Sequence, residues 1–199
     1  MSIFSINNKF KTQLITGILS SPLLYIPHYH YSYIDKVLME IFPEDNDADS
    51  ILGLGSKVIM EVTIGGDIID FHTKKEYRQR NLSDLLDEII VYEESKSNDI
   101  NFEDGQLVFL IKNSAELLKN IQIQLKLQTI AAKYERGEYP RELTILLVSP
   151  QPVECLPFEI EKLITVVDIP NPTAQIRCVE MLKKLTQRFS KSKPTVYDP

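Results

Sequence analysis

Apolar side chains recur at every third or fourth position in several stretches of the chain, which is the spacing of an amphipathic helix. The clearest stretch precedes Pro22, whose ring and missing N–H group end a helix. A second stretch begins at Ser32, whose side chain is expected to cap the helix. On this spacing we predict helices over residues 8–20, 32–42, 81–92 and 173–189.

Other short runs are apolar at nearly every position, which is typical of strands that are buried on both faces. These runs span residues 23–26, 107–111, 143–148 and 164–167. Because burial on both faces is characteristic of parallel sheets, we expect these four strands to be parallel neighbours. Residues 58–64 and 67–71 are β-rich and flank Gly65-Gly66, which indicates a β-hairpin.

The segment after residue 111 carries two competing patterns. Apolar and polar residues alternate from Ile121 to Leu127, as they do in a strand. We predict a helix instead, because the flanks are rich in Leu, Lys, Gln and Ala and because a link between parallel strands usually contains one. The sequence from Asn113 to Glu116 fits a capping box at the start of this helix. A short helical turn is expected over residues 157–163.

Helical and strand patterns alternate along the chain, so the predicted fold class is α/β, with a mostly parallel sheet flanked by helices on both faces. The 199 residues suffice for one such domain with a sizeable core. We expect this domain to occupy residues 1–190 and to be followed by a tail or linker over residues 191–199.

The composition of the chain limits the kinds of partner that it can be expected to bind. The formal charge of -6 argues against a nucleic-acid-binding protein, which usually carries a basic face. No run approaches the roughly 18 apolar residues of a membrane span, and no secretory leader is recognisable at the start. Cys155 and Cys178 lie in no metal-binding spacing. We therefore expect a cytoplasmic protein with two free thiols that binds neither nucleic acid nor membrane.

Three motifs in the last third of the chain resemble AAA-type ATPases: a strand that ends in Ser149-Pro150, the turn Leu156-Pro157-Phe158-Glu159-Ile160, and a last strand that leads into Pro170-Asn171-Pro172. In that family the small polar residue at the strand end is a sensor. The closest resemblance, over residues 9–189, is to the degenerate amino-terminal module of plastid- and cyanobacterial-type AAA ATPases. It implies a P-loop-like sheet in which strand 23–26 lies between strands 164–167 and 143–148.

The positions at which the family carries its chemistry are occupied by other residues. The loop 27–33 should bind phosphate, but it has no glycine and no Gly-Lys-Ser/Thr, and Lys36 lies about one helical turn too late. The central strand runs into Lys112-Asn113, where the family has Asp or Asp-Glu to hold Mg²⁺. No arginine lies between residues 155 and 169. We therefore predict no catalytic residue, no metal and no cofactor.

Three positions remain as vestiges of a nucleotide site in this interpretation: Lys112, Asn113 and Ser149. The segment 53–57, Gly-Leu-Gly-Ser-Lys, resembles a scrambled phosphate loop, but it precedes a strand instead of linking a strand to a helix, so we assign it no phosphate.

An aromatic loop follows the first strand and is the candidate ligand or partner site. It contains His28, Tyr29, His30, Tyr31 and Tyr33. Ligands of α/β sheets bind at the carboxyl ends of strands, where this loop is expected. The His-x-His pair suggests a metal, but Asp35 is the only acidic residue nearby, so we favour a surface loop or a partner-facing patch.

Acid–base chemistry is conceivable at Asp67, Asp70 and His72, which share the predicted hairpin. We interpret these residues instead as its solvated face, because charged residues alternate outward on such a strand pair.

The function most consistent with these patterns is a non-catalytic AAA-like module with a structural, regulatory or protein-interaction role. Its expected partner is an ATPase module in cis or in trans, and oligomerisation is left open. Two alternatives remain. The chain is the amino-terminal part of a longer AAA ATPase whose catalytic module lies beyond residue 199, or the aromatic loop 27–33 binds a small ligand or peptide.

Overall fold

The computed structural model describes residues 8–43, 57–63, 66–79, 81–91, 106–139 and 143–172, and helical positions at 174, 177–179, 181–182 and 185–186. Residues 44–50, most of the segment 53–57 and the expected tail 191–199 lie outside the described residues. The chain divides into two compact units near Pro170. Ile6–Ile169 holds the whole sheet, and the second unit contains the residues that follow.

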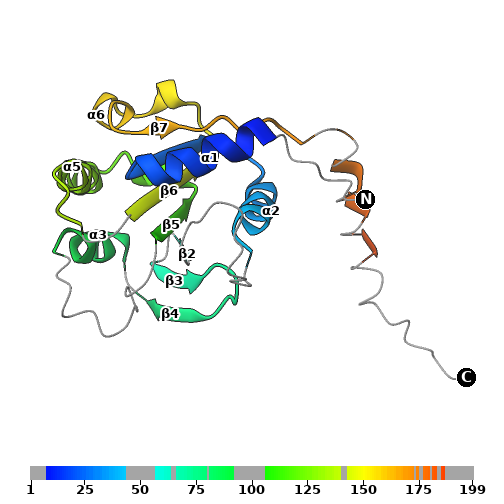
Figure 1. Ribbon diagram of the computed structural model, residues 1–199, viewed down its shortest axis with the longest axis horizontal. Helices are drawn as coiled ribbons and strands as arrows, with labels where there is room; N and C mark the ends of the chain where they lie inside the picture. Colours follow the sequence, from blue (N-terminus) through cyan, green and yellow to red (C-terminus); the bar gives the residue numbers. More distant parts are fainter. Residues whose placement is uncertain are drawn as a thin grey trace, which may run out of the picture. The chain divides into compact units, whose positions relative to one another are not determined.

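A seven-stranded sheet forms the centre of the larger unit, with strand order β4-β3-β2-β5-β6-β1-β7 (Figure 1). Its strands are β1 (Leu23–Pro27), β2 (Lys57–Val62), β3 (Asp67–Asp70), β4 (Glu76–Gln79), β5 (Gln106–Lys112), β6 (Leu143–Ser149) and β7 (Thr165–Val166).

Strand pairing confirms the expected arrangement of the parallel strands. β1 pairs in parallel with β6 on one side and with β7 on the other, so the first strand lies between the two strands that the resemblance implies. β5 pairs in parallel with β6 and with β2. β2 and β3 pair antiparallel, as the predicted hairpin requires. β4 pairs antiparallel with β3 and was not predicted from the sequence.

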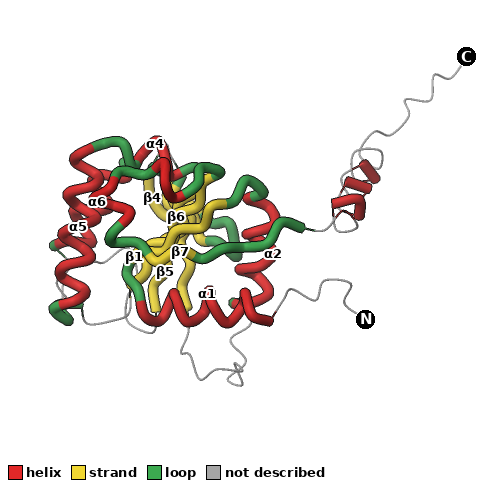
Figure 2. Tube along the Cα trace, turned by 90° about the horizontal axis from the view of Figure 1, so that it is seen from above, coloured by secondary structure: helices red, strands yellow, loops and turns green. Residues whose placement is uncertain are grey.

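Helices cover both faces of this sheet, as the alternating pattern predicts (Figures 1 and 2). One face packs against α1 (Asn8–Ser20) and α2 (Tyr31–Ile41). The other packs against α3 (Leu82–Ile90), α4 (Ser114–Leu117), α5 (Ile121–Glu135) and α6 (Phe158–Glu161). Alternate residues of β1, β5 and β6 therefore enter opposite cores, which is why these runs are apolar at every position.

Gly17 lets α1 approach the sheet closely. A Cβ atom at this position would lie 2.8 Å from the Cδ2 atom of Leu24, whose side chain is fully buried in β1. Glycine weakens a helix by about 1 kcal/mol relative to alanine. The close approach of α1 to β1 is the structural reason for glycine here.

Two predicted helix starts are wrong. α2 already begins at Tyr31, so Ser32 lies inside the helix, and His30 occupies the N-cap position without a capping hydrogen bond from its side chain. The capping box at Asn113 does not form, because Asn113 has left-handed backbone torsions (φ 55°) and its side chain makes no capping hydrogen bond. Residues after it form only the short α4, and the long helix α5 starts afresh with Asn120 as its cap. The preference for helix over strand in 121–127 is confirmed.

The last strand is also shorter and more exposed than predicted. β7 contains only Thr165 and Val166, and both side chains are exposed because β7 is the edge strand of the sheet. Burial resumes at Val167 and Ile169, after the strand. In the second unit, the described positions between 174 and 186 are helical, in agreement with the predicted helix over residues 173–189.

Candidate functional site

The carboxyl ends of β1, β5 and β6 lie side by side and bring the candidate residues to one edge of the sheet. The loop after β1 is tied directly to β6, because the backbone N–H of His28 donates to the carbonyl of Ser149 over 2.8 Å. The hydroxyl of Tyr25 donates to the carbonyl of Gln151 over 2.8 Å and fixes the loop after β6 to β1. These bonds close the gap between the two strand ends.

Lys112, at the end of β5, is held between two carboxylates. Its Nζ atom lies 2.8 Å from Oδ1 and 3.0 Å from Oδ2 of Asp35, which is on α2. It also lies 2.6 Å from Oε1 of Glu61, on β2. Glu61 accepts a second ammonium group at 3.2 Å from Lys74, which lies in the turn between β3 and β4. We call Asp35, Glu61 and Lys112 the ion cluster.

The ion cluster is partly buried and keeps some contact with solvent. The side chains of Asp35, Glu61 and Lys112 are 25%, 18% and 19% exposed. Burial by itself would lower the pKa of Lys112, but its hydrogen bonds to the two carboxylates outweigh burial and raise that pKa. Burial likewise opposes ionisation of Glu61, whereas Lys112 and Lys74 together lower its pKa. Glu61 and Lys112 are therefore both charged at neutral pH.

His28 is buried, with 2% of its surface exposed, so the surface-loop interpretation is wrong for this residue. Its Nδ1 atom accepts the backbone N–H of His30 over 3.0 Å, which places the proton of the neutral ring on Nε2. Nε2 is buried and has no hydrogen-bond partner among the described residues. Burial, followed by the neighbouring His30, lowers the pKa of His28, so the ring is neutral at pH 7.

Three residues of the aromatic loop, Tyr29, His30 and Tyr33, place their rings near that of His28. The rings of His28 and Tyr29 are stacked with centroids 5.5 Å apart, and Tyr33 lies 5.7 Å from His28. Tyr29 is 53% exposed, whereas Tyr33 belongs to the core beneath α2. The hydroxyl of Tyr31 hydrogen-bonds to the backbone beside β5, and burial raises its pKa. Within the described residues, no three His, Cys, Asp or Glu side chains come together as a metal site.

Ser149 and Asn113 hold ordinary structural positions. The Oγ atom of Ser149 is buried and accepts the backbone N–H of Gln151 over 3.3 Å, which shapes the turn after β6. Asn113 is exposed and makes the left-handed step that ends β5. Lys36 lies on α2, away from the cap of that helix.

The acidic residues of the hairpin shape turns. Asp67 accepts a hydrogen bond from the hydroxyl of Thr63 over 3.1 Å. Asp70 accepts the backbone N–H groups of His72 and Thr73 over 3.0 and 2.7 Å. Both aspartates are partly exposed, and their side chains are engaged in turns of the hairpin.

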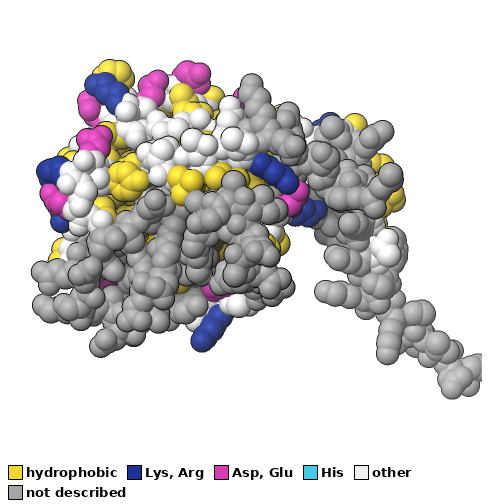
Figure 3. Space-filling view, viewed as in Figure 1, with side chains coloured by type: hydrophobic (Ala, Val, Ile, Leu, Met, Phe, Trp, Pro, Cys, Tyr) yellow, Lys and Arg dark blue, Asp and Glu magenta, His cyan; other side chains and the backbone are white. Residues whose placement is uncertain are grey.

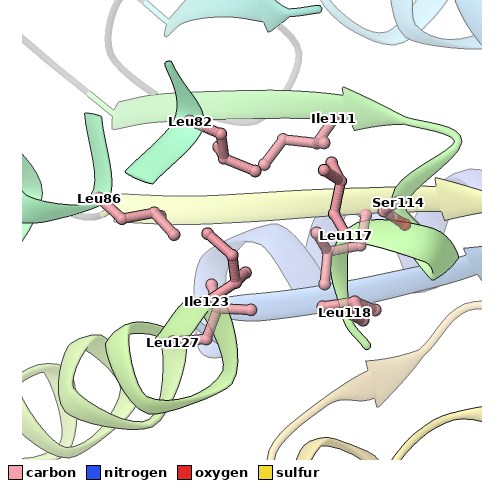
Figure 4. A pocket seen from close by; sticks show the side chains of 9 residues that line it. Leu82, Leu86, Ile111, Ser114, Leu117, Leu118, Ile123 and Leu127 are labelled. Atoms are coloured by element: carbon pink, nitrogen blue, oxygen red, sulfur yellow. The ribbon is translucent and has the colours of Figure 1, made fainter. Parts of the chain in front are cut away.

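One small apolar pocket lies elsewhere, between α3, α4, α5 and the sheet (Figure 4). Its cavity volume of about 10 Å³ is no larger than one water molecule needs. Its lining is Leu82, Leu86, Ile111, Ser114, Leu117, Leu118, Ile123, Leu127 and Leu147. Ser114 is the single polar residue in this lining, so we interpret the pocket as imperfect packing and not as a ligand site.

Charges of both signs are scattered over the described part of the face in Figure 3, and Lys and Arg side chains do not gather there in one patch. Within the described residues, no helix has the length and apolar character that crossing a membrane demands.

The likeness that comparisons with known proteins reveal is distant. No protein-family model matches the chain, and no curated protein matches it. Among solved structures, the chain is similar to the ORC2 protein of Aeropyrum pernix, solved as ADPNP–ADP complexes, with 15% sequence identity and a TM-score of 0.46. The likeness covers 96% of this chain and 52% of that one, so this chain spans about half of its length. The α/β fold therefore rests on the strand order and the two helical layers described above.

Sequence reasoning singled out Lys112 but missed its partners. Asp35 and Glu61 are 77 and 51 residues away from Lys112 in the sequence, on a helix and on a strand. The one available signal was their position. Asp35 falls on the first turns of the helix after β1, and Glu61 is the charged residue within an otherwise apolar strand segment.

Proposed function

We propose that this chain is a non-catalytic AAA-like module whose role is structural, regulatory or protein-binding. The observation that carries the proposal is the ion cluster: the end of the central strand presents an ammonium group that is already neutralised by Asp35 and Glu61. A positive charge at this position opposes Mg²⁺, and it engages the two carboxylates that lie beside the strand end.

The loop after β1 supports the same proposal. It reaches Ser149 through its backbone and buries the His28 ring, and it contains no glycine whose backbone N–H groups could wrap a phosphate. The degenerate amino-terminal module that the sequence resembles has such a role beside an active ATPase module. We propose that the partner is an active ATPase module, either in the same chain or in a separate one.

Calorimetric titration of the chain with MgATP tests the proposal. We expect no Mg²⁺-dependent turnover and at best about millimolar affinity, equivalent to roughly −4 kcal/mol. A dissociation constant near or below about 10 µM, or about −7 kcal/mol, that is abolished by Ser149→Ala or Lys36→Ala would overturn the non-catalytic assignment. The alternative of a longer ATPase gains support if the reading frame encodes a phosphate loop beyond residue 199.

A second candidate function is favoured by His28. Its Nε2–H group is a buried donor without an acceptor in the part of the chain that the structure describes, and such a group costs about 1–3 kcal/mol when it stays unpaired. An acceptor oxygen from a small ligand or peptide would relieve this cost. Nitrogen-15 NMR of the histidine rings, titrated with a blocked dipeptide, should shift the Nε2 resonance of His28 and leave His72 unchanged. An unshifted His28 resonance would remove this candidate.

A further inference from the structure

The ion cluster joins three separate elements at one point. Asp35 comes from α2, Glu61 from β2 and Lys112 from β5, so no short-range turn or helical spacing brings them together. Two carboxylates at such close quarters repel each other unless a cation lies between them. The fold itself therefore builds a place for one positive charge.

We propose that Asp35 and Glu61 form a cation site whose permanent occupant is the ammonium group of Lys112, in the place of a hard divalent cation such as Mg²⁺ or Mn²⁺. The inference deepens the proposed function and rests on it. A module that does not bind MgATP has no need of a metal ion here, so the lysine ammonium group can occupy the site permanently. Wild-type protein is then closed to metal, and removal of the ammonium group opens the site.

The geometry is that of a cation site. Three carboxylate oxygens lie 2.6–3.0 Å from Nζ of Lys112. Divalent hard cations bind carboxylate oxygens at roughly 2.0–2.6 Å, so small side-chain movements would bring Asp35 and Glu61 onto a metal ion. Lys112 is 19% exposed, which keeps its attraction to the carboxylates stronger than in bulk water.

Charge balance explains why the wild-type site excludes metal. Lys112 and the more exposed Lys74 (51%) together offset the charges of Asp35 and Glu61. Loss of the Lys112 ammonium group takes from Asp35 the cation that lies 2.8 Å away, and it leaves Glu61 with Lys74, which is 51% exposed. The substitution Lys112→Asp also supplies a third carboxylate from the end of β5.

A thermodynamic cycle tests whether Lys112 screens the two carboxylates. In the wild-type background, Asp35→Asn should lower the urea midpoint, because Lys112 loses one of its two partners. In the Lys112→Met background the same change should raise the midpoint or leave it unchanged, because it removes unscreened repulsion of Glu61. A matched cycle uses Lys126, which is 17% exposed and pairs with one carboxylate, Asp87, among the described residues. That cycle should show no reversal of sign. Equal losses from Asp35→Asn in both backgrounds would overturn the proposal.

Direct titration with Mn²⁺, followed by the electron paramagnetic resonance signal of the free ion, tests the opened site. Lys112→Asp should bind one Mn²⁺ at least about tenfold more tightly than wild-type protein and than the control Lys126→Asp, a difference of about 1.4 kcal/mol. If Lys112→Asp is unfolded without metal, Mn²⁺ should restore a cooperative unfolding transition. Mn²⁺ binding by Lys112→Asp no tighter than by the control, or failure of Mn²⁺ to restore its folding, would overturn the proposal.

These results are distinguishable from a failure of the proposed function. Tight MgATP binding by wild-type protein would refute the non-catalytic role, whatever the Mn²⁺ titrations show. Absence of both the sign reversal and the Mn²⁺ gain would remove the cation site and leave the calorimetric result on MgATP unaffected.

Discussion

At the scale of single residues, the environment of Lys112 is set by residues that are distant in the sequence. In the sequence it follows a buried strand as an unexplained charge, and in the structure it is the centre of the ion cluster. A half-buried ammonium group is stable there because Asp35 and Glu61 replace the water that it loses. Removing it should therefore cost stability in a way that depends on pH.

We predict that Lys112→Met lowers the free energy of unfolding by about 2 kcal/mol at pH 7, the range for hydrogen bonds to charged groups. The pKa of Glu61 is lowered in the folded state, so its contribution is full above its ordinary pKa of 4.5 and is lost as pH falls through the lower folded value. The pKa of Lys112 is raised, so its contribution is full below 10.5 and is lost as pH rises through the higher folded value.

Urea denaturation of wild-type protein and Lys112→Met across the acid range measures this dependence. The difference between the two should stay constant from neutral pH down to about pH 5 and shrink below that value. A difference that remains constant down to about pH 3 would contradict the role of Glu61 as a partner of Lys112.

Phe109 provides a second residue-scale prediction. It lies on β5 and is 1% exposed in the core beneath α3 and α5, as its buried strand predicted. Phe109→Ala should lower the free energy of unfolding by about 3–5 kcal/mol, because it leaves a cavity in a packed core. Phe158→Ala, at a position that is 64% exposed, is the matched control and should cost less than about 1 kcal/mol. A loss under about 1 kcal/mol at Phe109 on urea denaturation would show that it adds little to the core.

At the scale of elements, α5 shows how a strand-like pattern can belong to a helix. The buried residues Ile123, Leu127 and Ile130 follow helical spacing and face the core. Ile121 and Leu125 lie on the opposite side and are 67% and 51% exposed. The alternation arises because apolar residues occupy two faces of one helix, and not because the chain is extended.

We predict that substitutions at Asn113 and Asn120, the two asparagines that precede α4 and α5, have different effects on stability. Asn120 accepts the backbone N–H of Gln122 and caps the helix, so Asn120→Ala should cost about 1 kcal/mol. Asn113 makes no capping bond and has a φ of 55°, so Asn113→Gly should be neutral or slightly stabilising. Thermal unfolding of both variants measures the contrast. If Asn113→Gly were the more damaging change, the capping box of the sequence prediction would regain support.

At the scale of the whole molecule, the sheet is the element that decides the arrangement of the larger unit. Four parallel strands, β7, β1, β6 and β5, lie in the predicted neighbourhood, and helices cover both of their faces. Each unit also carries one cysteine, Cys155 in the larger and Cys178 in the other, and both thiols are exposed.

We predict that both thiols react in the folded, unreduced protein. Titration with a thiol reagent should find two reactive groups per chain at a rate that urea hardly changes, because neither side chain is buried. Recovery of no thiol before reduction would show that the two cysteines pair. A single fast thiol would show that one of them is protected in the native state.

The sequence by itself determined the local elements and the class of the fold. Apolar spacing depends on burial within each element, so α1 was predicted with its observed bounds, and β1, β5 and β6 to within a residue or two. The absence of glycine from the loop after β1 and the lysine at the end of β5 could also be recognised in the sequence, because each depends only on residue identity. Helix starts were less certain, since Ser32, Asn113 and Asn120 are all plausible caps in the sequence and only Asn120 makes a capping hydrogen bond.

Only the tertiary structure decided what surrounds those positions. Asp35 and Glu61 meet Lys112 because α2, β2 and β5 pack together, and no periodicity along the chain encodes a contact over 51 or 77 residues. The burial of His28 likewise depends on the fold of its loop against β6. Charge and burial at the edge of the sheet are properties of neighbours in space, so they could not be read from neighbours in sequence.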